Sequence, residues 1–151
     1  MRRLTPEDAP ACDAIIAALP YFFGDPIGVR NAASDLRKSG GWVIEDERRV
    51  TGFLCLTRST LDTAEIAWMA VHPEFQRGGR GRILVSQAVE SARAEGLRML
   101  MLFTSAQEDS RSSSHGFHAT RAFYREMGFA ELCVLKPEGW TEEHLLMARA
   151  L

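Results

Sequence analysis

The run from Val71 to Gly81 combines the residue types of an anion-binding site. It reads Val-His-Pro-Glu-Phe-Gln-Arg-Gly-Gly-Arg-Gly, with glycine at three of its last four positions. Glycine lets the backbone turn tightly and bring its N–H groups close to a ligand. A helix that starts at the end of this run adds unpaired N–H donors and the positive end of its dipole. The run therefore predicts a phosphate or pyrophosphate site, to which Arg77, Arg80 and Arg82 bring positive charge.

Two familiar nucleotide-binding loops do not fit this run. A Walker A loop requires Gly-x-x-x-x-Gly-Lys-Ser/Thr, and no lysine or hydroxyl residue stands in the corresponding place here. A Rossmann loop requires a third glycine three positions after Gly81, where Leu84 stands. On shape alone, a glycine-rich turn that binds no ligand stays open as the alternative.

The segments on either side of the glycine run predict the elements that hold it in place. An apolar segment at 64–71 indicates a strand before the run, and a dense apolar segment at 97–103 indicates a second, buried strand. Between the run and Gly96, apolar residues recur at the spacing of a helix. The chain from Ala64 to Phe103 is therefore expected to be one βαβ unit, with a parallel strand pair and a right-handed crossover.

The rest of the chain completes an α/β (α+β) pattern in a single domain over residues 1–151. Further strands are expected at 2–4, 42–45, 50–57, 130–135 and 144–149. Further helices are expected from Thr5 to just before Pro20, at 29–38 and at 119–127. We thus expect a mixed, mostly antiparallel sheet of six to seven strands flanked by about four helices. The Ser-rich stretch 105–114 is expected to be a mobile loop.

The composition is that of a soluble globular protein, with 46% hydrophobic and 25% charged residues among 151. A net charge of −2 gives no broad electrostatic case for binding nucleic acid or an anionic membrane. The N-terminal segment has no apolar region of a signal peptide, and no apolar run approaches the roughly 20 residues of a membrane helix. Three scattered cysteines, expected to be buried, argue against a disulfide framework or a metal site. We therefore expect a cytoplasmic protein without a metal.

Two stretches of the chain resemble the GNAT superfamily of acyl-CoA-dependent N-acyltransferases. The hexapeptide 76–81, Gln-Arg-Gly-Gly-Arg-Gly, matches the Gln/Arg-x-x-Gly-x-Gly/Ala motif of that family and lies between a strand and a helix, as it does there. The lead-in at 71–74 and the segment 122–129, Ala-Phe-Tyr-Arg-Glu-Met-Gly-Phe, resemble the family as well. The expected element order fits the GNAT fold from end to end. Segments 19–24, 64–66 and 120–124 look like a bacterial GNAT branch with no established acceptor.

The resemblance implies a binding site for acetyl-CoA. The pyrophosphate of coenzyme A would lie on the turn formed by Gln76, Arg77, Gly78, Gly79, Arg80, Gly81 and Arg82. Its hydrogen-bond donors would be backbone N–H groups, because that family binds the group through its main chain. The pantetheine arm would pair with the exposed backbone of Met69, Ala70 and Val71, where the two parallel strands splay apart in this family. One N–H near Met69 or Ala70 would stabilise the oxyanion.

The same resemblance implies a catalytic pair. Glu65 would take a proton from the acceptor amine, whose own pKa is about 10.4 for a lysine-like group, and nearby apolar residues could raise the pKa of Glu65. Tyr124 would protonate the departing thiolate. The alternatives are an ordinary strand-end glutamate in solvent and an aromatic residue that only packs. Many family members have an asparagine that contacts pantetheine seven positions before this tyrosine, but Phe117 stands there.

An aromatic run, Tyr21-Phe22-Phe23, lies where GNAT folds shape the acceptor site. An aromatic cluster there suits a small-molecule or peptide amine, and apolar packing of a loop is the alternative. Trp68 is expected to lie in the core, on the side of its strand opposite Glu65.

The sequence thus favours an N-acetyltransferase that moves an acetyl group from acetyl-CoA to a primary amine by direct attack in a ternary complex. A non-catalytic acyl-CoA-binding regulatory module and a ligand-free scaffold are the alternatives. The sequence identifies neither the acceptor nor the length of the acyl group. GNAT dimers are common, but nothing in this sequence requires a homodimer.

Overall fold

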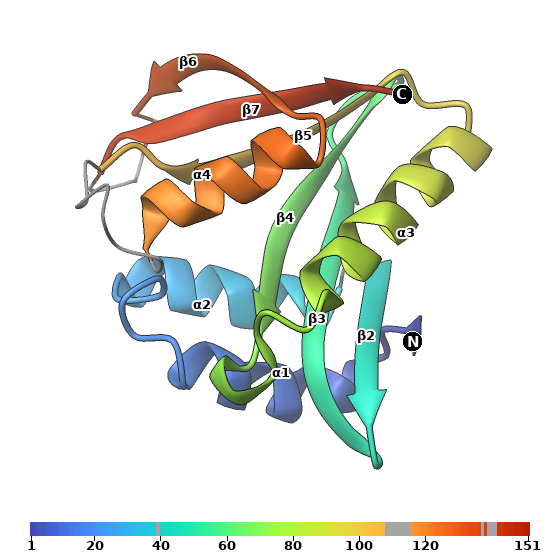
Figure 1. The fold of residues 1–151 in the computed structure, drawn as a ribbon, viewed down its shortest axis with the longest axis vertical. Coiled ribbons are helices and arrows are strands. Elements are labelled where there is room, and N and C mark those ends of the chain that lie inside the picture. The colour runs from blue at the N-terminus through green and yellow to red at the C-terminus, as the bar shows by residue number, and fades with distance from the viewer. Residues whose placement is uncertain (39, 108–115, 137, 139–141) are drawn as a thin grey trace.

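A mixed sheet of seven strands, in the order β1-β2-β3-β4-β5-β7-β6, forms the centre of the protein (Figure 1). The computed structural model describes residues 1–38, 40–107, 116–136, 138 and 142–151. The strands are β1 (Arg2–Arg3), β2 (Gly40–Asp46), β3 (Arg49–Arg58), β4 (Thr63–Val71), β5 (Met99–Ser105), β6 (Ala130–Leu135) and β7 (His144–Ala150). The helices are α1 (Ala9–Ala17), α2 (Pro26–Asp35), α3 (Arg80–Ala94) and α4 (Phe117–Glu126).

The predicted sheet is confirmed, including its one parallel pair, β4 with β5. The other pairings in the sheet are antiparallel. The first predicted helix begins at Thr5 as expected, but its first turn, Pro6–Asp8, is a 3-10 turn that leads into α1. Most of the loop predicted at 105–114 lies outside the described residues; Ser105 itself is the buried last residue of β5.

The second helix starts three residues earlier than its apolar pattern suggests. Asp25 is its N-cap and accepts hydrogen bonds from the N–H groups of Ile27 and Gly28, at 3.2 and 3.1 Å. Pro26 follows at the first helical position, where a missing N–H costs nothing. The Asp-Pro pair therefore sets the start of α2, and the first apolar residue of the pattern, Val29, does not.

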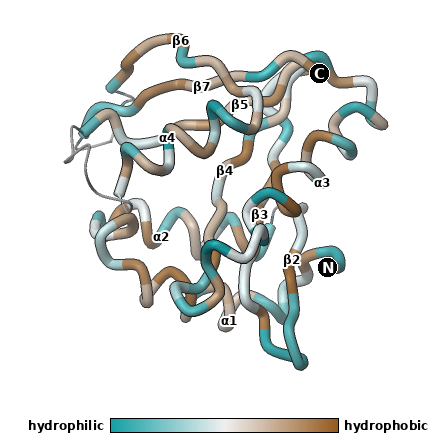
Figure 2. The backbone as a smooth tube through the Cα atoms, in the orientation of Figure 1, coloured by the Kyte–Doolittle hydropathy of each residue, from teal (hydrophilic) through white to brown (hydrophobic). Residues whose placement is uncertain are grey.

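Each face of the sheet carries its own apolar core. One core joins the strands to α3 and α4, and the other joins them to α1 and α2. Figure 2 shows hydrophobic residues along the strands and hydrophilic ones at the turn between β2 and β3. Cys12 and Cys55 lie in the second core, where burial raises the pKa of each thiol to about 12. The expectation that all three cysteines are buried is wrong for Cys133, which is exposed on the edge strand β6.

A β-bulge in β4 changes the face that Trp68 occupies. Adjacent residues of β3 pair with Ile66 and Trp68, which leaves Ala67 as an extra residue in β4. Trp68 therefore lies on the same face as Glu65, and its Nε1 donates a hydrogen bond to the Asp35 carboxylate at 2.7 Å. The prediction that Trp68 lies opposite Glu65 is wrong, because strict alternation ends at the bulge. Trp68 was also predicted to lie in the core, and it does pack against the second core, where it is half-buried.

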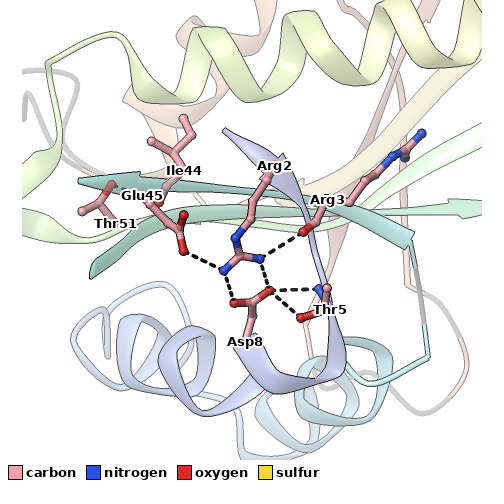
Figure 3. Close-up of polar contacts among 7 residues, drawn as sticks. All are labelled: Arg2, Arg3, Thr5, Asp8, Ile44, Glu45 and Thr51. Carbon is pink, nitrogen blue, oxygen red and sulfur yellow. Dashed lines mark hydrogen bonds and ion pairs between the residues drawn. The ribbon is translucent and has the colours of Figure 1, made fainter. Parts of the chain in front are cut away.

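An arginine–carboxylate network fastens the N-terminus to the sheet (Figure 3). The Arg2 guanidinium donates to both oxygens of Asp8 at 2.7 Å and to Glu45 at 2.7 Å. Asp8 also accepts hydrogen bonds from the N–H and hydroxyl of Thr5, at 2.9 and 3.1 Å. The hydrogen bonds from Arg2 are the main reason why the pKa of Asp8 lies below its usual value. This network holds the first helical turn against β1 and β2.

We expect Asp8→Asn to lower the free energy of unfolding by about 2 kcal/mol at neutral pH, because it weakens charge-assisted bonds to a nearly buried carboxylate. The folded state lowers the pKa of Asp8, so this contribution is complete above the unfolded pKa of about 3.9 and is lost as the pH falls through the folded one. Urea unfolding at pH 7 and at pH 3 measures it. Glu45→Gln is the matched control: its carboxylate is more exposed, so it should cost under about 1 kcal/mol. Equal costs for the two variants would contradict the assignment.

In the described part of the chain, no helix combines the length and the apolar character that crossing a membrane requires.

Candidate active site

The cleft of this protein opens where β4 and β5 separate. Their parallel pairing covers only the three pairs from Thr63↔Met99 to Glu65↔Met101. Beyond Glu65, β4 stays paired with β3 and β5 stays paired with β7, and Figure 1 shows β4 and β5 diverging. A cleft of about 1260 Å³ lies here, lined by β4, the start of α3, α4, α2 and the loop before α2. The edge of β4 that faces β5 therefore has no strand partner from Ile66 onward among the described residues, as the resemblance implies.

The glycine run folds into a tight turn at one end of this cleft. The amide of the Gln76 side chain donates to the carbonyl of Val71 at 3.0 Å and so ties the turn to the end of β4. Arg77 and Gly79 both have left-handed backbone angles, with φ of 63° and 78°. Gly79 is the N-cap of α3, and the first hydrogen bond of the helix runs from the N–H of Ile83 to the carbonyl of Gly79. The N–H groups between them lie at the open end of the helix, where an anion is favoured.

Gly81 lies where two helices approach each other closely. A Cβ at this position would lie 3.3 Å from Cζ of Phe123 on α4, so α3 and α4 come close together at the mouth of the cleft. A side chain there would force the Phe123 ring to shift by a few tenths of an ångström. The third glycine of the motif therefore positions the turn beside Tyr124, which follows Phe123.

The arginine side chains contribute less charge to the turn than their spacing suggests. Arg80 pairs with Asp46, the last residue of β2, at 2.6 Å and stacks on the Phe75 ring, 5.0 Å from its centroid. Arg82 forms an ion pair with Glu126 of α4. Two of the three predicted cations are thus neutralised by carboxylates within the protein. Backbone N–H groups and the dipole of α3 favour an anion at this turn independently of these two side chains.

Glu65 lies in the cleft at the point where the strands separate. Burial is the largest influence on its carboxyl group and raises its pKa above the ordinary value. The Ser59 hydroxyl, which donates to Glu65 Oε2 at 3.4 Å, partly opposes this shift, and the nearby Asp35 adds to it. A half-buried carboxylate with a raised pKa beside a cleft has the properties of a general base.

Tyr124 lines the same cleft from α4. Its side chain is buried, and its ring makes edge contacts with Phe123 and Phe129 at 5.1 and 5.6 Å between centroids. Burial raises the pKa of its hydroxyl well above the ordinary value of about 10. The group is therefore protonated at neutral pH, as a general acid must be before it acts.

A family model described as an acetyltransferase (GNAT) domain matches residues 37–131. The chain belongs to the GNAT acetyltransferase family.

Curated relatives of this GNAT protein include an amino-acid acetyltransferase from Pseudomonas fluorescens strain Pf0-1. It is 35% identical over 68 residues, which cover 45% of this chain but only 13% of that protein. A second amino-acid acetyltransferase, from strain SBW25 of the same species, is 34% identical over 68 residues, which again cover 45% of this chain and 13% of that protein. This chain therefore matches only a small part of these relatives.

Solved structures show that this GNAT protein has the fold of its family. A GNAT family protein from Desulfovibrio desulfuricans superimposes with a TM-score of 0.81 over 99% of this chain and 96% of that one, at 24% identity. The ribosomal-protein-S18-alanine N-acetyltransferase of Escherichia coli gives 0.74 over 99% and 91%, at 22% identity. A GNAT family acetyltransferase from Elizabethkingia anophelis with acetyl-CoA bound gives 0.65 over 89% of each chain, at 16% identity. At these identities the likeness establishes the fold.

In this GNAT protein, Phe117 belongs to an aromatic cluster at the far end of the cleft. Its ring lies 5.4 Å from that of Tyr21 and 5.3 Å from that of Phe22, between centroids. All three rings line the cleft, and Phe117 is the first residue of α4. The residue that departs from the family pattern thus connects α4 to the loop before α2.

Phe23, the third residue of the predicted aromatic run, lies apart from that cluster. Its ring is 6.3 Å from Trp68 of β4 and packs against the second core. Both it and Trp68 line the cleft. The sequence does not predict the role of Trp68 here, because that role depends on the bulge in β4.

Arg121 braces α4 against the end of β5. Its Nη1 donates to the carbonyl of Ser105 at 2.9 Å and to that of Gln107 at 3.0 Å. These bonds fix the N-terminal half of α4, and with it Phe117, beside the cleft.

Proposed function

We propose that this GNAT protein moves an acetyl group from acetyl-CoA to a primary amine by direct attack within a ternary complex. The observation that carries the proposal is the separation of β4 from β5, which opens a cleft with Glu65 and Tyr124 on its walls and the glycine turn at one end. The residues of that turn suit the anionic part of coenzyme A. The unpaired edge of β4 suits its amide-containing arm.

Each step of the transfer has a residue of this chain that fits it. Glu65 accepts a proton from the ammonium form of the acceptor, and the neutral amine then attacks the thioester carbonyl carbon. A backbone N–H of β4 near Met69 or Ala70 donates to the carbonyl oxygen, which gains negative charge. As the C–N bond forms and the C–S bond breaks, Tyr124 gives its proton to the departing sulfur. The acceptor nitrogen then loses its second proton, which restores the Tyr124 hydroxyl, and Glu65 releases the first proton to solvent. The products are the N-acetylated amine and free coenzyme A.

Release of free thiol from acetyl-CoA in the presence of a panel of primary amines tests this proposal directly. Turnover that depends on the amine supports it. Stabilisation by coenzyme A with no transfer to any amine would favour the alternative of a regulatory acyl-CoA-binding module. No stabilisation at all would favour a ligand-free scaffold. Propionyl-CoA and longer acyl-CoA donors in the same assay establish the acyl group.

We expect Gly79→Ala to weaken the binding of coenzyme A at least about tenfold, and so to remove most of its stabilising effect in a thermal-shift titration. Gly79 has a left-handed backbone, with φ of 78°, and no heavy atom lies within 4 Å of a Cβ placed there. The new methyl group would project from the cleft-lining turn, and the strain would also disturb the N–H donors.

Gly96→Ala is the matched control for this variant. Gly96 lies just beyond the other end of α3, its φ is 72°, and a Cβ there likewise meets no heavy atom within 4 Å. Both variants should therefore lose about 1–2 kcal/mol of stability through the same backbone strain. Only Gly79→Ala should lose the shift caused by coenzyme A. Equal shifts in the two variants would rule out the glycine turn as the binding site.

A further inference from the structure

One edge of the sheet is left open by β6. This strand pairs with β7 on one side, and no described strand pairs with it on the other, so the backbone groups of its outer side have no strand partner within the sheet (Figure 1). The opposite edge is formed by β1, which is two residues long and consists of two arginines. A short, charged edge strand is a usual protection against pairing with another sheet, and β6 is longer and mostly uncharged.

The side chains of β6 are largely apolar and lie at the surface. All six residues of the strand are exposed, and Leu132, Val134 and Leu135 are 58%, 51% and 42% exposed. Among the described residues, no other strand contributes a large hydrophobic side chain to the exposed surface. Apolar side chains on an open edge strand are the kind of surface that a partner strand covers. β6 therefore gains buried apolar area when a second strand pairs with it.

The charges that flank this apolar segment fit a second copy of the same segment. Residues 131–136 read Glu-Leu-Cys-Val-Leu-Lys, with four uncharged residues between an acid and a base. When the segment pairs antiparallel with itself about a two-fold axis between Cys133 and Val134, Glu131 of each copy lies opposite the partner's Lys136. Opposite charges directly across two antiparallel strands stabilise their pairing, and like charges destabilise it. The segment is thus complementary to itself in both its apolar residues and its charges.

The contacts of β6 within its own chain are compatible with this pairing. Glu131 forms an ion pair with Arg125 of α4, with 3.5 Å between Nε and Oε1, and both side chains are exposed. A carboxylate accepts hydrogen bonds at two oxygens, so Glu131 can meet a lysine as well. A β-bulge at Leu132 interrupts the pairing with β7, but the pairing is regular from Cys133 to Leu135. The residues beside the two-fold axis therefore belong to the regular part of the strand.

We propose that two copies of this chain associate through β6, paired antiparallel with Glu131 of each copy opposite the partner's Lys136, so that the two sheets become one. The contact uses the same edge of both copies and leaves it open on neither, so assembly stops at the dimer. This inference goes beyond the proposed function and does not depend on it.

Sedimentation velocity of the full chain between about 1 and 100 μM tests the association, because an interface of modest size dissociates in this range. The wild type should pass from monomer to dimer and form nothing larger. Val134→Lys should stay monomeric, since it places a charge from each copy beside the two-fold axis. Val134 is exposed, so the variant should keep the circular dichroism spectrum of the folded chain. Leu61→Lys is the matched control: it adds the same charge at an exposed apolar residue between β3 and β4 and should dimerise like the wild type.

Charge reversal tests the register of the pairing. Glu131→Lys places two lysines opposite each other at both ends of the paired segment, and Lys136→Glu places two carboxylates there. Each variant alone should therefore dimerise about tenfold more weakly than the wild type in low salt. An equal mixture of the two variants has opposite charges at both ends again and should associate with the affinity of the wild type. Misfolding cannot explain such a recovery, because mixing changes neither protein.

Three results would overturn the proposal. A wild-type chain that is monomeric throughout the concentration range would leave the β6 edge to an extended segment of another protein. A dimer that survives Val134→Lys would place the interface elsewhere on the surface. If Val134→Lys is monomeric but the mixture of Glu131→Lys and Lys136→Glu associates no more tightly than either variant alone, the two-fold pairing of β6 with itself is wrong.

Discussion

Glu65→Gln is expected to lower kcat by roughly 100-fold, the usual contribution of a general base, and to remove the acidic limb of the pH profile. Glutamine has the shape of glutamate but cannot take up the proton of the amine. Because burial raises the pKa of Glu65, its carboxylate retains a proton at pH values where an exposed glutamate has lost it. It is therefore a stronger base than an ordinary carboxylate.

The direction of the pH effect follows from the role of the base. Glu65 acts only when deprotonated, so kcat/KM should fall as the pH drops through its pKa, at a value above the ordinary 4.3 or so. Rates of thiol release measured from pH 4 to pH 9 with a fixed amine would show this limb. In Glu65→Gln the remaining slope should reflect only the protonation of the amine itself.

Ser59→Ala provides a control with a readout of its own. The Ser59 hydroxyl donates to Glu65 and lowers the pKa of that group, so its removal should move the acidic limb to higher pH. A structural role for Glu65 would not predict this shift. Wild-type kcat in Glu65→Gln, with the limb unchanged, would show that another group is the base.

The glycine run shows how far the sequence determines this site. Its tight turn was predictable from its glycines, because Gly79 has a left-handed φ and Gly81 lies close to Phe123. The left-handed φ of Arg77 was not predictable, because an arginine gives no signal of it. The strand and helix around the run were predictable, because their apolar periodicity is unambiguous. The direction of the arginine side chains was not predictable. Asp46 and Glu126, which pair with Arg80 and Arg82, are distant in sequence, and only the fold brings them near.

The end of the cleft opposite the glycine turn depends on features that a residue pattern hides. One extra residue, Ala67, reverses the face of Trp68, and a bulge of this kind leaves no mark in the alternation of apolar residues. Phe117 departs from the family motif, and its contacts with Tyr21 and Phe22 become visible only once α4 is placed. The Asp-Pro start of α2 was readable from capping rules, which outweigh the apolar spacing that begins at Val29.

Tyr124→Phe is expected to lower kcat by about 10- to 100-fold while changing the free energy of unfolding by less than about 1 kcal/mol. The ring of Tyr124 packs on Phe123 and Phe129, and phenylalanine preserves those contacts. The Tyr124 hydroxyl has no hydrogen-bond partner among the described residues, and the residue lines the cleft. The fold therefore loses little when the hydroxyl is removed. The sulfur of coenzyme A would then leave as an unprotonated thiolate.

The pH profile separates the acid from the base. Burial keeps the pKa of Tyr124 well above its ordinary value, so the wild-type enzyme should show no basic limb from this residue up to about pH 9. Tyr124→Phe should therefore lower the plateau of kcat without moving the acidic limb that Glu65 sets. Rate measurements over the same pH range as for Glu65→Gln make the comparison direct.

Phe123→Leu distinguishes this chemistry from packing. Phe123 contacts Gly81 and the Tyr124 ring, so its truncation should cost more stability than Tyr124→Phe, by about 1–2 kcal/mol, because it loosens the contact between α3 and α4. It should lower kcat less, since no proton donor is lost. The two variants thus rank in opposite order by urea unfolding and by turnover if the Tyr124 hydroxyl is the acid. If Phe123→Leu instead lowers both the free energy of unfolding and kcat more than Tyr124→Phe does, Tyr124 only packs α4 on the sheet.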